Sequence, residues 1–316
     1  MIEPIDIVSE IKRKALELGF SACGFAPAVP LTDFENDFHE WISSGYAGEM
    51  TYLTRNADIR LDPRKLVENA KTVISLAAPY YYTLPPAVPG IPRISRYALG
   101  DDYHQVLKSM GMELLKWIRT EIASVNGRIF TDSAPIFERE WARRAGLGWI
   151  GRNGCLIIPG QGSWFFLAEI VVDIDIQDVN PIVKDRCGNC TRCTDACPTG
   201  ALSADGSLDP RKCISYLTIE HRSDIPETFR GKWDDWVFGC DLCQDACPWN
   251  SKPLQSAIER LRPKPELAEP DTDFLKDLDE GLFNKKFNGT PVMRAGFQGI
   301  LRNFEFLDRE QKITVG

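Results

Sequence analysis

Residues 187–198 read CGNCTRCTDACP, and residues 240–248 read CDLCQDACP. The first stretch has the spacing C-x2-C-x2-C-x3-C-P of bacterial ferredoxins, in which the fourth cysteine ligates the other of two 4Fe–4S clusters. The second stretch repeats the ending C-x2-C-x3-C-P. We therefore expect a ferredoxin-like module with two 4Fe–4S clusters in this part of the chain.

The cysteines of this region can be divided into two sets of four ligands. Cys213 lies between the two stretches and is the remaining candidate for the eighth ligand. A proline follows each crossing cysteine, where it turns the chain away and removes a backbone donor. Cluster one is predicted to be bound by Cys187, Cys190, Cys193 and Cys247. Cluster two is predicted to be bound by Cys213, Cys240, Cys243 and Cys197.

Disulfides and zinc sites fit the cysteine pattern less well. Disulfides suit small secreted domains, whereas this chain has 316 residues and no apolar leader at its start. Structural zinc sites also use C-x2-C pairs, but they rarely show the third close cysteine or the trailing C-P. Cys23 and Cys155 stand apart and are interpreted as small buried side chains on strands.

Composition and charge set wider bounds. Hydrophobic residues make up 43% of the chain, which predicts a buried core. There is no run of 18 apolar residues, so we expect no membrane span and a cytoplasmic protein. The formal net charge of −8 is mildly unfavourable for a nucleic-acid partner, but a local basic patch would suffice for one.

The remaining sequence predicts a mixed α/β or α+β protein in three parts. These are an α/β domain over 1–180, the ferredoxin-like module over 181–250 and a helical segment over 251–316. Helices are predicted at 5–18, after residue 33, at 103–123 and at 290–307, the last capped by Thr290-Pro291. Strands are predicted at 20–25, 72–78, 127–132, 155–158 and 164–173, the last two as a pair joined by a Pro-Gly-Gln-Gly turn.

The length of the chain favours an enzyme over an electron carrier. A ferredoxin module alone needs only about 60 to 80 residues. An additional domain that receives electrons at another centre accounts better for the rest of the chain.

A second candidate site surrounds Asp132. This carboxylate is predicted to end an apolar strand, and a glycine-rich run, 146–154, follows soon after. Carboxylates at strand ends beside glycines are typical of binding sites, although a helix N-cap accounts for Asp132 equally well. The glycine run lacks the spacing of the known phosphate-binding loops.

The three histidines lack the pattern of a histidine that ligates cobalamin. His39 and His104 each end an Asp-x-His pattern, but in neither case does a glycine come three residues later. His39 is interpreted as a helix-surface residue. His104 stays ambiguous at the start of a helix, and His221 could lie at the mouth of a site.

Several stretches together resemble one family, the epoxyqueuosine reductases, which are cobalamin-dependent iron–sulfur enzymes of queuosine synthesis in tRNA. The resemblance runs in the family's order over nearly the whole chain. It rests on 50–56 (MTYLTRN), 96–104 (RYALGDDYH), 132–153, 162–164 (GSW), the cysteine stretches, 213–218 (CISYLT) and 301–303 (LRN).

The resemblance implies a reaction and a set of site residues. Epoxyqueuosine at the tRNA wobble position would lose its epoxide oxygen as water, using electrons passed from an external one-electron donor through the clusters to cobalamin. Asp132 matches the family's proton donor, and we expect burial against the corrin to raise its pKa. Cobalamin, bound without a histidine ligand, would contact Arg55, Ser95, Asp132, Leu156, Leu167 and Ser215. Glu220, His221 and Arg222 match a segment that contacts the tRNA anticodon loop.

Two departures from the family accompany the resemblance. Ser95 stands where some members have cysteine. Many members continue into a C-terminal extension of helical repeats, so the chain resembles a short form. Candidate phosphate contacts are Arg139, Arg143, Arg144, Arg152, Arg222, Lys285, Lys286, Arg294 and Arg302.

Two other functions share the cluster signal. A reductive dehalogenase or a similar reductase of a small molecule would use both cofactors, but the chain shows no twin-arginine signal and no membrane anchor. A ferredoxin-type electron carrier would bind no corrin.

Overall fold

A four-stranded antiparallel sheet organises the first half of the molecule. The computed structural model describes residues 6–178, 181–203, 205–271 and 273–314. The strand order is β1-β2-β7-β4, and every neighbouring pair is antiparallel. The strands are β1 (Ala22–Pro27), β2 (Thr72–Pro79), β7 (Phe165–Val172) and β4 (Gly127–Phe130). The mixed α and β class predicted from the sequence is confirmed.

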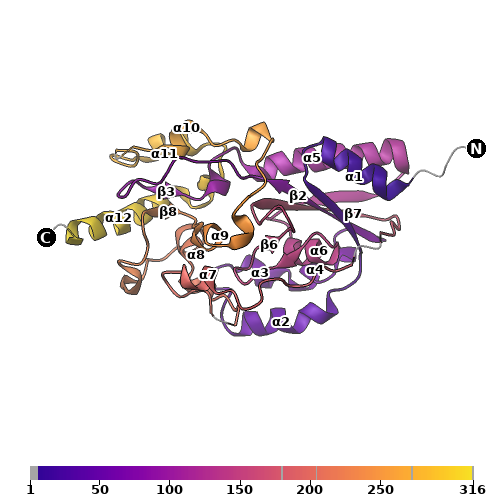
Figure 1. Ribbon diagram of the computed structural model, residues 1–316, viewed down its shortest axis with the longest axis horizontal. Coiled ribbons are helices and arrows are strands. Elements are labelled where there is room, and N and C mark those ends of the chain that lie inside the picture. The colour runs from indigo at the N-terminus through magenta and orange to yellow at the C-terminus, as the bar shows by residue number, and fades with distance from the viewer. Residues whose placement is uncertain (1–5, 179–180, 204, 272, 315–316) are drawn as a thin grey trace, which may run out of the picture.

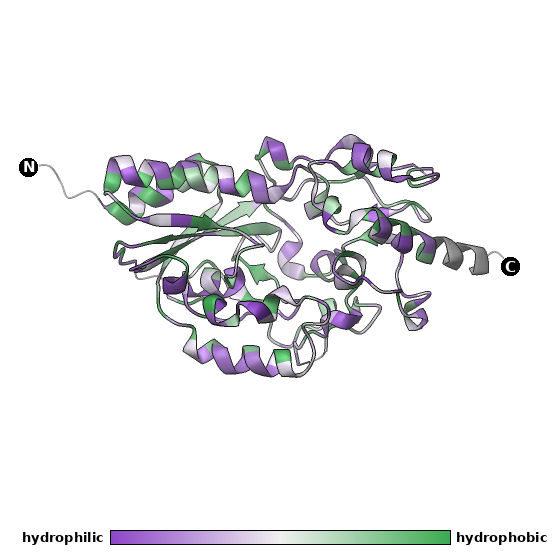
Figure 2. Ribbon diagram, turned by 180° about the vertical axis from the view of Figure 1, so that it is seen from behind, coloured by the Kyte–Doolittle hydropathy of each residue, from purple (hydrophilic) through white to green (hydrophobic). Residues whose placement is uncertain are grey.

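Helices cover both faces of this sheet because its central strands are apolar on both sides. Ile74 of β2 packs with α1 (Ile7–Glu17) and α5 (Tyr103–Trp117). The adjacent Val73 points to the opposite face, where it packs with α2 (Thr32–Ser43) and α6 (Glu138–Arg144). Figure 1 shows these two helical layers, and Figure 2 shows the apolar strands between them.

The short elements connect these layers. A π-helical turn, Ile118–Ile122, continues α5, and two one-turn helices, α3 (Tyr52–Arg55) and α4 (Ala57–Arg60), follow α2. Turns of 3-10 helix lie at Pro63–Lys65, Arg96–Ala98, Pro210–Lys212, Glu227–Phe229, Pro248–Asn250, Glu259–Leu261 and Pro291–Arg294.

The predicted pairing of the strands around 155–158 and 164–173 is wrong. β6 (Leu156–Ile157) pairs with β5 (Trp149–Ile150), while β7 lies between β2 and β4. Only an isolated bridge joins Ile158 to Gly162. Seven of the eight residues of β7 are buried, so the strand gains more from a central position with neighbours on both edges than from a surface hairpin.

The cysteine-rich segment and the C-terminal helices share a second core. A short parallel pair joins β3 (Arg93–Ile94) to β8 (Trp236–Phe238). Around it lie α7 (Arg192–Asp195), α8 (Ile214–Ile219), α9 (Leu242–Asp245), α10 (Pro265–Ala268), α11 (Glu280–Phe287) and α12 (Gly296–Thr314). Buried side chains of α8, β8, α11 and α12 form one cluster. In the part of the chain that the structure describes, none of these helices is long and apolar enough to cross a bilayer.

The predicted start of the last helix differs from the structure. Thr290 is followed by a 3-10 turn, and its hydroxyl donates to the carbonyl of Phe287 at 2.7 Å instead of capping the turn. The α-helix begins at Gly296, whose φ is +72°. A left-handed glycine separates the two helical segments, so the pattern of good helix starters marked a turn rather than α12 itself.

We predict that Asn303 fastens α12 to the second core. Its side chain is fully buried and donates to the carbonyls of Thr218 at 2.8 Å and Val237 at 2.9 Å. Asn303→Ala leaves both carbonyls unpaired and is expected to lower the free energy of unfolding by about 2–4 kcal/mol. A fall of several degrees in the thermal midpoint, followed by circular dichroism, would show this. The exposed Gln298 of the same helix provides the control, Gln298→Ala, which should change little; equal midpoints for both variants would contradict the prediction.

Candidate functional site

Four of the eight predicted cluster ligands line one cavity. Its volume is about 70 Å³, and Cys187, Cys190, Cys193 and Cys247 contribute to its wall. The other lining residues are Arg152, Asn153, Ile157, Arg186, Pro248 and Trp249. The structure therefore brings Cys247 to the three cysteines of the first stretch, as the prediction for cluster one requires.

The other four cysteines also lie near one another. Burial raises the pKa of Cys240, and the charges of Cys213 and Cys197 act in the same direction. The pKa of Cys243 is likewise raised by burial and by the charges of Cys155, Cys213 and Cys240. These charges act on one another, so the thiols lie in one region of the fold. The grouping of Cys197 with Cys213, Cys240 and Cys243 is the one predicted for cluster two.

The thiols fit a cluster better than a single metal ion. Zinc draws its sulfur ligands to about 2.3 Å from one point. Among the residues that the structure describes, no three His, Cys, Asp or Glu side chains converge closely enough to hold one ion. Four thiols spread around a cavity are instead suited to a larger inorganic group. The two remaining cysteines belong to neither set, and burial raises the pKa of Cys23 to about 12 and that of Cys155 to about 11.

Asp132 lies just beyond the end of β4 at the open edge of the sheet. It is not a helix N-cap, because α6 begins at Glu138 with Phe137 as its N-cap. Its φ of +44° is in the left-handed region, which Asp tolerates better than most residues. The backbone N–H of Asp132 donates to Glu138, and the hydroxyl of Thr131 donates to the carbonyl of Leu167 at 3.0 Å. These bonds hold the turn in place.

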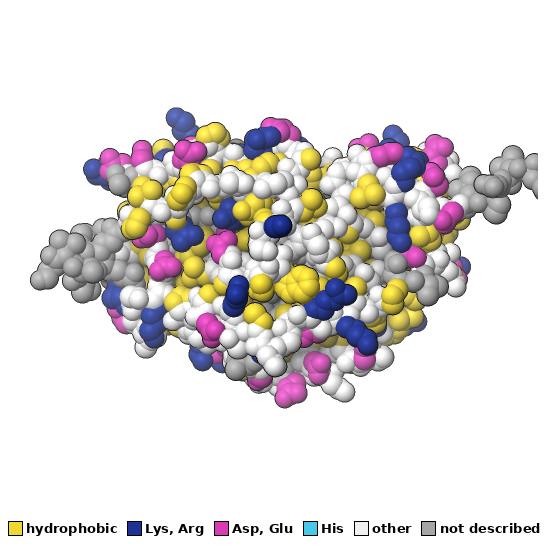
Figure 3. All heavy atoms as spheres, in the orientation of Figure 1, with side chains coloured by type: hydrophobic (Ala, Val, Ile, Leu, Met, Phe, Trp, Pro, Cys, Tyr) yellow, Lys and Arg dark blue, Asp and Glu magenta, His cyan; other side chains and the backbone are white. Residues whose placement is uncertain are grey.

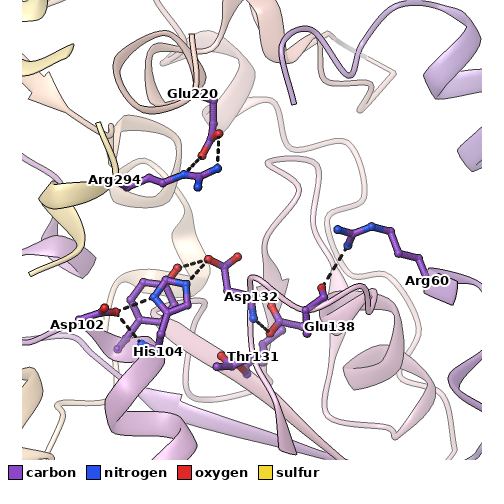
Figure 4. Close-up of polar contacts among 11 residues, drawn as sticks. Arg60, Asp102, His104, Thr131, Asp132, Glu138, Glu220 and Arg294 are labelled. Atoms are coloured by element: carbon purple, nitrogen blue, oxygen red, sulfur yellow. Dashed lines mark hydrogen bonds and ion pairs between the residues drawn. The ribbon is translucent and has the colours of Figure 1, made fainter. Parts of the chain in front are cut away.

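The carboxylate of Asp132 is bonded by two neighbours from the start of α5. The hydroxyl of Tyr103 donates to Oδ2 at 2.6 Å, and Nε2 of His104 lies 2.8 Å from the same oxygen. On its other side, Nδ1 of His104 lies 2.7 Å from Oδ1 of Asp102. Figure 4 shows His104 between the two carboxylates. The side chain of Asp132 remains 54% exposed, so it can reach a bound molecule.

The electrostatics of this group correct the expected pKa of Asp132. Burial raises that pKa, but the hydrogen bonds from His104 and Tyr103 outweigh burial, and the net shift is downward. For His104, burial lowers the pKa, whereas the bonds to Asp102 and Asp132 raise it, with a net value of about 9. At neutral pH the proton therefore resides on His104, and Asp132 is charged. The expected rise in the pKa of Asp132 did not include the hydrogen bonds from Tyr103 and His104 of α5.

Two further carboxyl groups lie behind Asp132. Burial, and next the charge of Asp132, raises the pKa of Glu138 to about 8. Glu169 on β7 is fully buried, and burial and the charge of Glu138 raise its pKa well above the ordinary value. Both groups are therefore neutral at pH 7, and Asp132 carries the only negative charge of these three.

An aromatic wall adjoins the carboxylate. The ring of Tyr103 stacks on Phe166 with centroids 4.2 Å apart, and it stacks on His104 at the same centroid distance. Tyr97 contacts both Tyr103 and Phe166 edge-on. Phe166 is buried, so the half-buried Tyr97 and Tyr103 are the more exposed rings of this group.

The expected cobalamin contacts other than Asp132 lie in surroundings that differ from one residue to the next. Leu156 and Leu167 lie together in one small buried cluster, and Arg55 is exposed at the end of α3. Ser95 is buried, and its hydroxyl donates to Asp241. Ser215 is half-buried on α8. The hydroxyl of Ser95 is therefore engaged by the cluster segment. Its backbone N–H donates to the carbonyl of Phe238 at 2.8 Å, and its carbonyl accepts from the N–H of Ala98 at 2.9 Å.

All three histidines lie in the described part of the chain, and each lies beside at least one carboxylate. His104 is held by two carboxylates. His221 lies 3.2 Å from Glu49, and His39 is exposed on α2 and lies 3.7 Å from Glu35.

The three predicted tRNA-contacting residues form one surface with the C-terminal segment. Glu220 pairs with Arg294 at 2.9 Å. The guanidinium of Arg222 donates to the carbonyls of Ala295 at 3.1 Å and Arg294 at 3.3 Å. The charge of Arg294 also lowers the pKa of Asp132, and Figure 4 shows Arg294 and Glu220 on the side of Asp132 away from Glu138.

Most of the other candidate phosphate contacts have internal partners. Arg143 and Arg144 both pair with Glu140, at 2.6 and 2.7 Å, and Arg302 donates to three backbone carbonyls of the segment 217–223. Arg139 donates to Gly154, Arg152 to Gly188 and Lys286 to Phe274. Lys285 is exposed. Figure 3 shows Lys and Arg side chains on both sides of exposed apolar groups near the centre of one face.

Sequence reasoning did not assign roles to Tyr103, Asp102 or Glu138. The signal for the first two was present in the run Asp-Asp-Tyr-His at the start of a helix, where an Asp-x-His pair can share a proton. Glu138 carried no such signal, because its burial depends on how α6 packs on the sheet.

Two family models match parts of the chain. Residues 186–250 match the family model of the 4Fe-4S double cluster binding domain, which confirms the predicted two-cluster module. Residues 60–133 match the family model described as epoxyqueuosine reductase QueG, DUF1730.

Similar proteins extend over nearly the whole chain. An epoxyqueuosine reductase of Cyclobacterium marinum is 45% identical over 304 residues, covering 95% of this chain and 96% of that protein. That of Xanthomonas campestris is 38% identical over 95% of this chain and 86% of its own length. A crystal structure of an epoxyqueuosine reductase with a modified tRNA stem loop is 29% identical, with a TM-score of 0.87 over 95% of this chain and 80% of that one.

The charge distribution around His104 generates a prediction. Its imidazole should titrate near pH 9 instead of the ordinary 6.5, because two carboxylates stabilise the protonated ring. Asp132→Asn removes one of them and should lower the pKa of His104. Nitrogen NMR resolves the ring, since the chain has only three histidines, and the exposed His39 is the internal control. A pKa of His104 near 6.5 in the unmodified protein would contradict the charge pair.

Proposed function

The chain belongs to the epoxyqueuosine reductase family, and we propose that it reduces epoxyqueuosine to queuosine at the wobble position of tRNA. The observation that carries the proposal is the likeness to epoxyqueuosine reductases along nearly the full chain. The site adds a proton donor of the right kind, because a charged imidazole and a carboxylate share one proton beside an aromatic wall. The reaction removes one oxygen as water and consumes two electrons and two protons.

The two sets of cysteines would hold the clusters, and the surface beside Asp132 would receive cobalamin. When bound, these groups supply the electrons that the side chains cannot provide. Leu156 and Leu167 would contact the corrin. An external one-electron donor is required, and a tRNA substrate would place the reaction in the cytoplasm.

The residues of this chain would handle the proton. His104 holds a proton at Nε2 at neutral pH and passes it to Oδ2 of Asp132 as water is excluded from the site. Asp132 then donates it to the oxygen that leaves the substrate, which would otherwise depart as a poorly stabilised alkoxide. Asp102 holds Nδ1 of His104 and stabilises the charged ring, and Tyr103 orients the acceptor oxygen.

The turn at Asp132 would keep this donor in place without making it rigid. Glu138, neutral at pH 7, anchors the backbone N–H of Asp132 while adding no second charge. A related Bacillus subtilis enzyme, 28% identical with a TM-score of 0.86, has been solved with its aspartate-bearing catalytic loop swung out of the active site. Movement of the turn would therefore let the substrate enter.

The tRNA would approach over the surface formed by Glu220, His221, Arg222 and Arg294. The anticodon loop is single-stranded, so its wobble base can be splayed away from its neighbours and stacked on aromatic side chains. Arg294 is the candidate for contact with the phosphate backbone, since its side chain is 54% exposed beside Asp132.

The function is tested with the reconstituted protein. Under anaerobic conditions, iron, sulfide, cobalamin and a reductant are added, and the protein is incubated with tRNA that carries epoxyqueuosine. Loss of one oxygen from the nucleoside, measured by mass after digestion and dependent on cobalamin, is expected. An unchanged mass with both clusters and the corrin bound would favour a reductase of a small molecule. Failure to bind the corrin at all would favour an electron carrier.

Asp132→Asn should reduce turnover by about 10²–10⁴-fold, the usual contribution of a general acid. Asparagine tolerates the same positive φ, so the turn and corrin binding should persist, as checked by the visible spectrum. His39→Gln serves as the control and should retain activity. Unmodified turnover in Asp132→Asn would exclude the proposed proton donor.

The activity should also fall as the pH rises through about 9. His104 has a pKa raised to about 9, so its proton is available below that value and absent above it. His104→Gln should remove this step from the profile of turnover against pH while lowering the plateau. A profile that keeps its alkaline limb in the variant would assign that limb to another group.

Arg294→Gln should weaken binding of an anticodon stem–loop and make binding less dependent on salt. Removing the charge that neutralises one phosphate lowers the slope of log affinity against log salt by about 0.7 for a single strand. Arg13, which pairs with Glu10 at 2.7 Å on α1, provides the matched control Arg13→Gln. Equal slopes of log affinity against log salt for the two variants would show that Arg294 does not contact the tRNA.

A further inference from the structure

One residue that lines the cavity of the first cysteine set has a polar group whose hydrogen bonds are not satisfied by the protein. Asn153 lines this cavity together with the four thiols, and its side chain belongs to a residue that is only 7% exposed. Its amide nitrogen, Nδ2, is buried and has no hydrogen-bond partner among the described residues. Buried amide donors are nearly always satisfied in folded proteins, so this nitrogen indicates a missing acceptor.

The orientation of the amide follows from its other end. Oδ1 of Asn153 accepts from the backbone N–H of Cys155 at 3.2 Å. A backbone N–H can only donate, so the oxygen must face Cys155, and the nitrogen must face away from it. The donor direction is therefore set by a backbone contact.

The tip of the β5–β6 hairpin holds Asn153 rigidly. The backbone N–H of Gly151 donates to the carbonyl of Cys155 at 2.9 Å, and that of Gly154 donates to Gly151 at 2.8 Å. A Cβ at position 151 would lie 2.6 Å from Ile157 and 3.0 Å from Oδ1 of Asn153. Glycine at this position lets the amide pack closely, so the donor is positioned before any ligand arrives.

The neighbouring cation Arg152 differs from Asn153 in this respect. It also lines the cavity, but its guanidinium donates to the carbonyl of Gly188 at 2.9 Å. It thereby ties the hairpin to the loop between Cys187 and Cys190. Asn153 is the lining residue with a buried donor that the rest of the described chain does not use.

We propose that Nδ2 of Asn153 donates a hydrogen bond to a sulfur of the cluster held by Cys187, Cys190, Cys193 and Cys247, and so raises its reduction potential. The inference rests on the cluster ligands proposed above. A hydrogen bond to a cluster sulfur stabilises the added electron, and such bonds are one of the factors that set these potentials. Asn153 thus contacts the cluster and adjusts its reduction potential. It takes no part in the proton chemistry at Asp132.

Two variants separate the hydrogen bond from the charge and from the fold. Asn153→Asp keeps the oxygen that accepts from Cys155 but replaces the donor by a negative charge. Asn153→Leu has a similar size and no charge, and it removes the donor. Both reconstituted enzymes are titrated electrochemically and followed by electron paramagnetic resonance, and iron content per chain is measured for each.

The midpoint of one cluster should fall in both variants, while that of the other stays unchanged. For Asn153→Leu we expect reduction to become about tenfold less favourable, which corresponds to ~59 mV for a one-electron step. Asn153→Asp should fall further. Unchanged midpoints in Asn153→Leu, or equal shifts of both clusters, would overturn the proposal.

A second readout is made on the unsubstituted enzyme, with Asn153→Asp as its control. In enzyme labelled with nitrogen-15 at the asparagine side chains, pulsed electron paramagnetic resonance should detect a nitrogen coupled to the reduced cluster. The coupling should disappear in Asn153→Asp, and its absence from the unsubstituted enzyme would overturn the proposal. Normal clusters without this coupling would leave the proposed function standing, whereas a chain that binds no iron would contradict the proposed function itself.

Discussion

The structure depends on one strand, β7, whose two faces must both be kept from water. Its burial requires a strand on each edge and a helical layer on each face, and these demands position β4, α5 and α6 around it. The end of β4 and the start of α5 then meet at one edge of the sheet, where Asp132 and His104 come into contact. The site is thus a consequence of how an apolar strand is covered.

Only some of the titratable groups at that edge of the sheet are charged. Two ionised carboxylates, Asp102 and Asp132, flank one imidazolium, while burial keeps Glu138 and Glu169 neutral. A positive charge from Arg294 faces the same carboxylate from the C-terminal segment. In the proposed mechanism, the proton needed for reduction would be stored on a histidine that is stable in its charged form, and the aspartate would stay ionised until its surroundings change.

Most of the fold could be predicted from the sequence. Of the candidate site, the sequence predicted the cluster cysteines better than the group around Asp132 and His104. Cysteine spacing located the cluster module and placed Cys247 with the first stretch, because ligand spacing is a local signal with few alternatives. The strand at 164–173 was recognised from its apolar run, but its partner was wrong, since pairing depends on burial by elements distant in sequence. The role of His104 was ambiguous for the same reason: its second carboxylate comes from Asp132, 28 residues away. Its effect on the pKa of Asp132 could be seen only once both side chains were placed.

The crossing of Cys247 into the cavity of Cys187 has a consequence for biosynthesis. The ribosome synthesises the chain from the N-terminus, so Cys247, the fourth thiol of that cavity, is made about 60 residues after Cys187, the first. With the proposed ligand set, the nascent chain would expose three thiols without the fourth until Cys247, which follows α9, has left the ribosome. Assembly factors that deliver iron and sulfide would meet a complete binding site only after the whole module is synthesised, and ribosome pausing within this interval would prolong the exposure of those thiols to oxidants.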